Sequence, residues 1–290
     1  MGTGYAIAFI TILLYGSWPV PTKTLKIDSK VLAFWLTVGH LIISIAIFLF
    51  VAQPIAVRDL FWPTFAGIIW AIGITSAYVA IKNLGVTRAV GIWVPIIIVI
   101  SSLWGLIFFG EAKLLGTEKV IRTILAIGLL LLSTLAIVMS SKGEKKFGNL
   151  KTGLLSALVI GLFSGSFFVP MRLSPLPPAV SFLPMSFGTV LLTSFLLLTK
   201  KQKVIYNPTT TGRMILAGII LGAGNFMSLL TIQRLGVAQG FPLTQMALIV
   251  NTLWGVLFFK EVATARGKFF IALSIAIAIA GILTLNSARP

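Results

Sequence analysis

The sequence lacks cysteine altogether and is poor in acidic residues, with 6 aspartates and glutamates and one histidine beside 23 lysines and arginines in 290 residues. Without cysteine the chain can form neither a disulfide nor a thiolate metal site. Charged residues make up only 10% of the chain, whereas a soluble domain carries about 25%. A water-facing surface cannot be built from this composition, so a soluble protein is excluded.

Apolar residues dominate instead, with a hydrophobic fraction of 58% and a mean hydropathy of +1.06. Ten apolar runs are each long enough for a helical span of about 20 residues, and lipid leaves the backbone of such a run no alternative to a helix. We expect an all-α polytopic membrane protein with ten transmembrane helices, and an N-terminus that is not a cleaved signal. The runs lie at residues 4–22, 31–52, 62–82, 86–109, 120–140, 151–172, 179–199, 213–233, 237–259 and 266–286.

The net charge of +17 would point to nucleic acid in a soluble protein. Here the lysines and arginines cluster between the apolar runs, so we expect a lipid bilayer and no nucleic acid as partner. Sixteen of the 23 follow odd-numbered spans and seven follow even-numbered spans. The positive-inside rule then places both termini outside.

The chain contains two of its segments twice. LGVTRAVGIWVPIIIVISSLWGLIFFGE at Leu84–Glu111 returns as LGVAQGFPLTQMALIVNTLWGVLFFKE at Leu235–Glu261. GSWPVPTK at Gly16–Lys23 returns as GSFFVPMR at Gly165–Arg172, and the offsets of 149 and 150–151 residues agree. The chain is therefore a duplication of about half its length.

We divide the chain into a first five-helix repeat at 1–141, a linker at 142–150 and a second five-helix repeat at 151–290. Because five spans is an odd number, the second repeat enters the membrane with the opposite orientation. Such 5+5 inverted repeats are typical of secondary transporters, whose solute site lies at the midplane between the repeats. We expect alternating access, with one half rocking against the other.

These repeated segments resemble the drug/metabolite transporter superfamily, built from five-plus-five inverted repeats. Within it the chain is most similar to the glucose/ribose porter family of bacterial sugar uptake proteins, since GVAQGFPLTQMALIVNTLWGVLFFKE is similar to that family's ninth span. The Gly-Ser-x-x-Val-Pro-x-Lys/Arg motif at 16–23 and 165–172 is similar to related carbohydrate transporters. The resemblance implies transport of a small solute, sugars first, across a bacterial inner membrane.

Polar side chains gather in span 9 and in the span before it. Thr244 and Asn251 share one face of a helix, with Gln245 beside them, and Asn225 and Ser228 lie one turn apart in span 8. Amides are costly in hydrocarbon, so these residues face the bundle interior. They are candidates for solute contact, with hydrogen bonding between helices as the equal alternative.

Aromatic residues without an aromatic at the equivalent position of the other repeat are candidates for lining a pocket. Trp70, Trp93 and Tyr78 belong to this group, as does Trp18, opposite Phe167. Rings together with amides suit a sugar or another small amphipathic solute.

The two Gly-Ser motifs near the ends of spans 1 and 6 are candidate hinges. Proline removes a backbone N–H and clashes with the preceding turn, so each motif either gates one side of the cavity or simply ends its helix. We favour the hinge, because the motif occurs in both halves. The candidate gating residues are Gly16, Ser17, Pro21, Gly165, Ser166 and Pro170.

Other notable residues have structural interpretations. Trp104 and Trp254 hold equivalent positions, which favours packing between the halves. His40 lies inside span 2, where joining helices is favoured over a proton relay. Glu111 and Glu261 end spans 4 and 9, so we expect solvated carboxylates beside lysines. With no buried carboxylate expected, facilitated diffusion or coupling through unusual groups is favoured.

No metal-ligand cluster, nucleophile–histidine pair or phosphate-binding glycine loop occurs in the sequence. We expect no enzyme activity, cofactor or metal, and a monomer or homodimer. The predicted function is secondary transport of a small polar solute, most readily a sugar. Export of amino acids, nucleobases or amphipathic drugs is the alternative within transport, and a non-transporting membrane scaffold or receptor is the alternative outside it.

Overall fold

A computed structural model gives the fold and describes residues 2–51, 53–140, 148–199, 203–259 and 264–287. Every regular element in these ranges is a helix. The elements are α1 (Gly2–Ser17), η1 (Val20–Thr22), α2 (Ser29–Val51), η2 (Val57–Leu60), α3 (Phe61–Leu84), α4 (Val86–Leu103), η3 (Trp104–Phe108), α5 (Glu111–Leu115), α6 (Thr117–Ser140), α7 (Leu150–Ser164), α8 (Phe168–Leu173), α9 (Pro178–Leu198), α10 (Pro208–Leu235), α11 (Val237–Thr244), α12 (Ala247–Leu257) and α13 (Ala265–Ser287).

Nine helical segments in the described ranges are long and apolar enough to cross a membrane. They coincide with nine of the ten predicted spans. The remaining one is span 9, which was predicted as a single helix over 237–259 and is divided into α11 and α12. The all-helical multi-span fold is thus confirmed, with one span broken. The linker predicted at 142–150 lies outside the described residues up to position 147.

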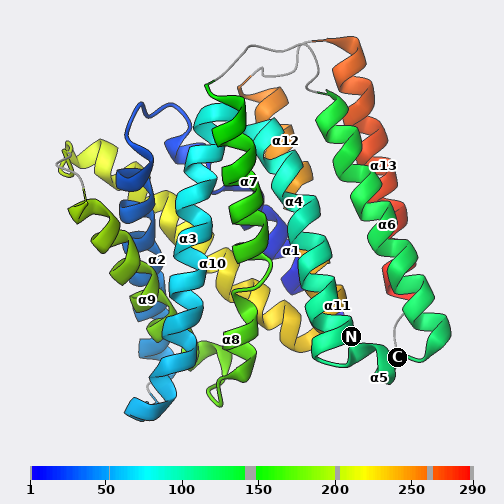
Figure 1. Cartoon of the computed structure of the whole chain (residues 1–290), viewed down its shortest axis with the longest axis horizontal. Helices are drawn as coiled ribbons and strands as arrows, with labels where there is room; N and C mark the ends of the chain where they lie inside the picture. The colour runs from blue at the N-terminus through cyan, green and yellow to red at the C-terminus, as the bar shows by residue number, and fades with distance from the viewer. Residues whose placement is uncertain (1, 52, 141–147, 200–202, 260–263, 288–290) are drawn as a thin grey trace.

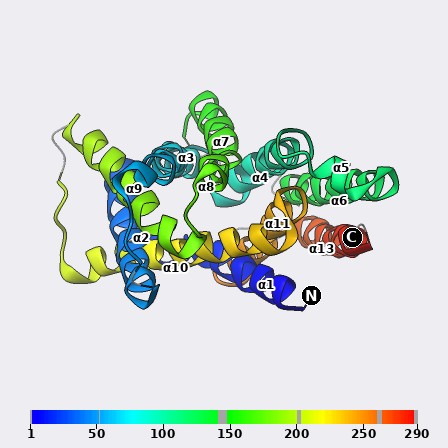
Figure 2. The same ribbon diagram turned by 90° about the horizontal axis from the view of Figure 1, so that it is seen from below.

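The helices form an elongated array seen in section in Figure 2, with α9 and α2 towards one end and the α6–α13 pair at the other. Both termini lie at the same side of the array, near α5 (Figure 1). The polypeptide turns at the two Gly-Ser motifs, where α1 gives way to η1 and α7 gives way to α8. Each motif therefore ends a long helix and starts a short one.

The two halves of the chain are interleaved. The first half's α3 packs against α7 and α9 of the second half, and α10 of the second half packs against α1 and α2 of the first. Contacts link α1, α2, α10 and α12 into one bundle and α3, α4, α7 and α9 into another, and α2 and α9 pack against each other between them. Each bundle draws helices from both halves of the sequence, and the expectation that one half rocks against the other stays a prediction.

Glycines bring two pairs of these helices together at backbone distance. A Cβ atom on Gly39 of α2 or Gly218 of α10 would collide with the backbone of the other helix. Gly67 of α3 and Gly188 of α9 make the same close approach. Small residues permit such contacts between membrane helices, where dispersion forces drive association. Since Gly39 matches Gly188 and Gly67 matches Gly218 in the repeat, the two contacts exchange equivalent positions.

The repeated motifs contact each other across the halves in the same reciprocal way. The Trp104 indole N–H donates to the Ser166 hydroxyl at 3.0 Å, and that of Trp254 donates to the Ser17 hydroxyl at 3.0 Å. The packing interpretation of the two tryptophans is thereby confirmed, and each Gly-Ser motif receives the Leu-Trp-Gly segment of the other half. Reciprocal contacts of this kind are compatible with an inverted repeat, which stays a prediction.

Candidate solute site

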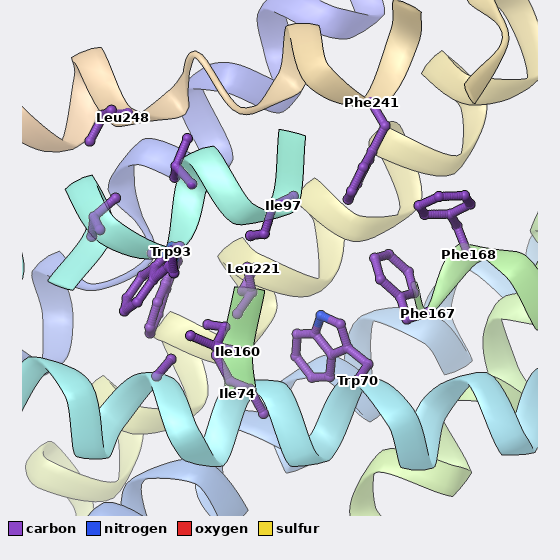
Figure 3. Packing of buried hydrophobic residues seen from close by; sticks show 14 of the residues in the cluster. Trp70, Ile74, Trp93, Ile97, Ile160, Phe167, Phe168, Leu221, Phe241 and Leu248 are labelled. Atoms are coloured by element: carbon purple, nitrogen blue, oxygen red, sulfur yellow. The ribbon is translucent and has the colours of Figure 1, made fainter. Parts of the chain in front are cut away.

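A cavity of about 90 Å³ lies in the centre of the bundle, between α1, α3, α4, α7, α10 and the α11–α12 break. Figure 3 shows rings and branched side chains from several of these helices converging on this region. The lining residues are Tyr15, Trp18, Trp70, Ile74, Val90, Trp93, Val94, Ile97, Ile160, Ser164, Phe167, Leu221, Asn225, Phe241, Gln245, Ala247, Leu248 and Asn251.

The break between α11 and α12 places polar groups at this cavity. Two tight turns replace the helical bonds there, with the Gln245 N–H donating to the Pro242 carbonyl at 3.1 Å and the Met246 N–H donating to the Leu243 carbonyl at 3.1 Å. Pro242 has no N–H to donate, which weakens α11 one turn before the break. Discontinuous helices of this kind form solute sites in transporters.

Three amides line the cavity, as predicted. Asn225 comes from α10, Gln245 from the break and Asn251 from α12. The Gln245 amide donates to the Thr244 hydroxyl at 3.3 Å. No hydrogen bond of Asn251 occurs within the described part of the chain. An amide next to a cavity and without such a partner is available to a solute.

The predicted rings Trp18, Trp70 and Trp93 also line the cavity. Trp18 directly follows α1, Trp70 lies in α3 and Trp93 lies in α4, and all three are buried. Phe241 packs against Phe167 at a ring-centroid distance of 5.9 Å on another side of the same cavity. The site therefore combines a few amides with a largely aromatic wall, which is the usual composition of small-molecule sites.

Three of the predicted solute contacts lie elsewhere. Tyr78 lines a separate cavity and meets Trp18 edge to face at 5.6 Å. Thr244 is buried and donates to the Phe241 carbonyl at 2.7 Å. Ser228 is buried next to the Tyr15 hydroxyl. Thr244 and Ser228 were predicted here as polar residues and Tyr78 as an unmatched aromatic, and none of the three lies at the wall of the central cavity.

Tyr15 and His40 were not predicted as part of the site. Tyr15 lines the cavity, and its hydroxyl donates to the Asn225 carbonyl oxygen at 2.7 Å. His40 is fully buried and bonds Asn225 and Ser186, so it does join helices as expected. A signal for Tyr15 was available, since it lies one helical turn before Trp18.

Two larger cavities flank the central one at opposite ends of the helices. A cavity of about 780 Å³ includes Lys23, Tyr78 and Gly85, and one of about 480 Å³ includes Glu111 and Arg172. The Lys23 ammonium lies 4.8 Å from the Phe259 ring centroid, as the Arg172 guanidinium does from that of Phe109. Burial lowers the pKa of Lys23 from 10.5 to about 8.

Glu111 contradicts the expectation of a solvated carboxylate and of a chain without a buried one. It is only 8% exposed. Its two oxygens accept the backbone N–H groups of Val237 and Ala238 at 2.8 and 2.9 Å, which satisfies the first turn of α11. Arg172 Nη1 lies 3.3 Å from the same carboxylate. A first-half residue thus ties together α8 and α11 of the second half, whereas Glu261 lies outside the described residues.

The candidate hinge residues all lie at the two helix interruptions. Gly16 packs closely against Val250, and Gly165 packs against Ile100, which is the equivalent position of the other repeat. Ser17 and Ser166 accept the tryptophan N–H groups described above. Pro21 lies in η1 and Pro170 in α8. The structure therefore brings each motif against the repeated segment of the other half.

Within the described residues no group of three or more histidines, aspartates or glutamates is placed to hold a metal ion. A bundle of membrane helices around a central cavity, with a broken helix carrying amides into it, defines a membrane transporter. The family described as "Sugar transport protein" matches residues 6–287. The chain belongs to this family, and it is a sugar transporter rather than an enzyme.

Its relatives agree. "Glucose uptake protein GlcU" of Bacillus subtilis (strain 168) is 32% identical over 261 residues, which cover 87% of each chain. "Probable glucose uptake protein GlcU" of Priestia megaterium is 30% identical over 252 residues, covering 85% of this chain and 86% of the relative. A crystal structure at 19% identity has a TM-score of 0.70 and covers 98% of this chain and 96% of its own, which supports the fold. The protein is a multi-pass integral protein of a bacterial cell membrane and handles a small-molecule solute.

Proposed function

We propose that this protein takes up a monosaccharide, glucose first, through the central cavity. The observation that carries the proposal is the convergence of Asn225, Gln245 and Asn251 with three tryptophans on one buried space. Sugar hydroxyls both donate and accept hydrogen bonds, so they pair with amides. The C–H face of a sugar ring packs on an aromatic ring. The names of the GlcU relatives support glucose as the first candidate.

The small size of the central cavity supports a site that changes shape during transport. Its volume of about 90 Å³ equals about three water molecules in the liquid, and small-molecule pockets usually hold about 300–1,000 Å³. The bundle must therefore open before a hexose enters. Cavities of about 480 and 780 Å³ at the two ends are the natural entrances. Alternating access connects the central site to one entrance at a time.

We further propose that the two repeats are inverted relative to each other and that Gly16–Pro21 and Gly165–Pro170 are the hinges. Each motif lies where a long helix stops, beside the repeated segment of the other half. The moving units in this proposal are the two mixed bundles, not the sequence halves. The protein works in the lipid bilayer as a monomer or homodimer, with no nucleic-acid partner.

Uptake by the purified protein in liposomes tests the proposal. Labelled glucose should enter saturably and should be displaced by excess unlabelled sugar, while liposomes without protein stay empty. Amino acids, nucleobases and cationic dyes serve as competing solutes. Displacement by one of these classes with no effect of any sugar would overturn the sugar assignment. No flux of any solute would favour a scaffold or receptor.

A further inference from the structure

His40 lies at the centre of a buried hydrogen-bonded chain that ends at the solute cavity. Its Nδ1 lies 2.8 Å from the Ser186 hydroxyl, and its Nε2 lies 3.0 Å from the Asn225 amide nitrogen. The rings of Trp70 and Phe182 flank the imidazole at 4.9 and 4.8 Å. Within the described ranges no carboxylate, lysine or arginine bonds the ring. The neutral imidazole therefore has one partner on each nitrogen.

The protons along this chain follow one direction. Ser186 donates its single hydroxyl proton to the Phe182 carbonyl at 2.8 Å, so its oxygen accepts from Nδ1–H of His40. The other nitrogen of a neutral imidazole is then an acceptor, and the Asn225 amide donates to it. The Asn225 carbonyl oxygen accepts from Tyr15 at 2.7 Å. This is the arrangement that also lets Ser186 keep its bond to the helix.

We propose that His40 is a positioning residue that sets the orientation of the Asn225 amide for sugar binding. An asparagine amide has two N–H groups and two carbonyl lone pairs. His40 takes one N–H and Tyr15 takes one lone pair. One donor and one acceptor remain on a residue that lines the cavity. Two neighbouring sugar hydroxyls match such a pair, one donating and one accepting.

The orientation matters because a flipped amide exchanges the donor and the acceptor. With His40 in place, the flip would put the carbonyl oxygen against the lone pair of Nε2, which is repulsive. Gly222, one turn before Asn225, lets the ring approach, since a Cβ there would lie 3.2 Å from Cδ2 of the imidazole. The chain also crosses four helices, α1, α10, α2 and α9, so both bundles hold Asn225. This inference rests on the proposed sugar site.

Two polar substitutions separate the two bonds of His40. His40→Gln places an amide oxygen where Nε2 accepts from Asn225, whereas His40→Asn is shorter and reaches only the Ser186 side. We expect the glucose KM of His40→Gln to stay within about twofold of the wild-type value. His40→Asn should raise the KM about five- to tenfold, the usual effect of one misplaced hydrogen bond, with a smaller change in maximal rate. Equal KM values for the two variants would overturn the proposal.

A double substitution tests whether His40 acts through Asn225. In an Asn225→Ala background, His40→Asn should change the glucose KM no further, because there is no amide left to orient. A purely structural role would add its full effect there and refute the inference. Thr37→Val is the matched control, since it removes another buried bond between α2 and α9, to Thr193 at 2.7 Å, and should leave the KM unchanged. If the unaltered protein moves no sugar, the proposed function itself fails, and this outcome is distinct from a failure of the His40 inference, which compares variants of a transporting protein.

Discussion

The two copies of the repeated segment have the same ends and different middles. In the first copy, α4 runs without interruption from Val86 to Leu103 and carries Pro95 inside. In the second copy, the helix breaks at Gln245 between α11 and α12. The middle of the first copy, Ile92–Ile100, has no polar side chain except Trp93. The middle of the second supplies Gln245 and, one turn after the break, Asn251 to the cavity.

What the copies share serves contacts between the halves. In each copy the helix begins after a glycine with a positive φ, Gly85 at 78° and Gly236 at 79°, a conformation that other residues adopt only at a cost. Towards its end, each copy carries a tryptophan that donates to the serine of the opposite Gly-Ser motif. Shape-dependent packing is thus duplicated, whereas of the two copies the second alone brings amides to the cavity. A symmetric scaffold therefore carries an asymmetric site.

The sharpest test of this asymmetry uses equivalent positions in the two copies. Asn251→Ala removes an amide from the cavity, and we expect the initial rate of glucose uptake at low concentration to fall about 10- to 100-fold, since unpaired polar groups cost about 1–3 kcal/mol. Ser101→Ala, at the equivalent position, should be close to wild type because Ser101 donates within its own helix, to the Ile98 carbonyl at 3.1 Å. Similar losses in both variants would make the site symmetric.

A second test asks whether the two hinges are equivalent but opposed. Pro21→Ala and Pro170→Ala each restore a backbone N–H and allow the helix to straighten. We expect each to shift the equilibrium between the two access states by about 1–3 kcal/mol, in opposite directions. Single cysteines near the 480 and 780 Å³ cavities, in a chain that has no native cysteine, report the shift as labelling from either side. Shifts in the same direction would show that the prolines only end their helices.

The prediction with the smallest expected effect concerns the pH dependence of stability at Lys23, whose counterpart in the second repeat is Arg172. Because the pKa of Lys23 is about 8 in the fold against 10.5 ordinarily, the unfolded chain holds more protons between these values. The free energy of unfolding should therefore rise as the pH rises from about 8 towards 10.5. Arginine keeps its proton throughout, so Lys23→Arg should remove this rise. Thermal unfolding in detergent measures both, and parallel pH curves would contradict the assignment.

Most of the fold could be predicted from the sequence because hydropathy alone marks long helices in lipid. The break in the ninth span could not. Pro95 and Pro242 lie inside equivalent segments, yet only the second segment breaks. Proline frees backbone groups in both helices, so a proline inside a segment does not by itself predict a break.

The site was predictable in its residue types but not in its connections. Amides and unmatched tryptophans identified six of the lining residues, because amides are costly in lipid and rings suit a pocket wall. The bond from Tyr15 to Asn225 spans 210 residues, and nothing local indicates it. Glu111 was misjudged because its partners are backbone N–H groups of Val237 and Ala238, which have no side-chain signature. Only Gly236 marks the turn that exposes them.

The glycine contact between α2 and α10 also sets the order of events during synthesis. Gly218 follows Gly39 by 179 residues, which a ribosome adds at about 5–20 residues per second, so α2 waits roughly 10–35 s for its partner. During that interval the glycine face of α2 meets lipid tails, while the backbone N–H and C=O groups of α2 stay paired within the helix. The first half can thus be inserted and held, but the contact between α2 and α10 forms only once α10 has left the ribosome.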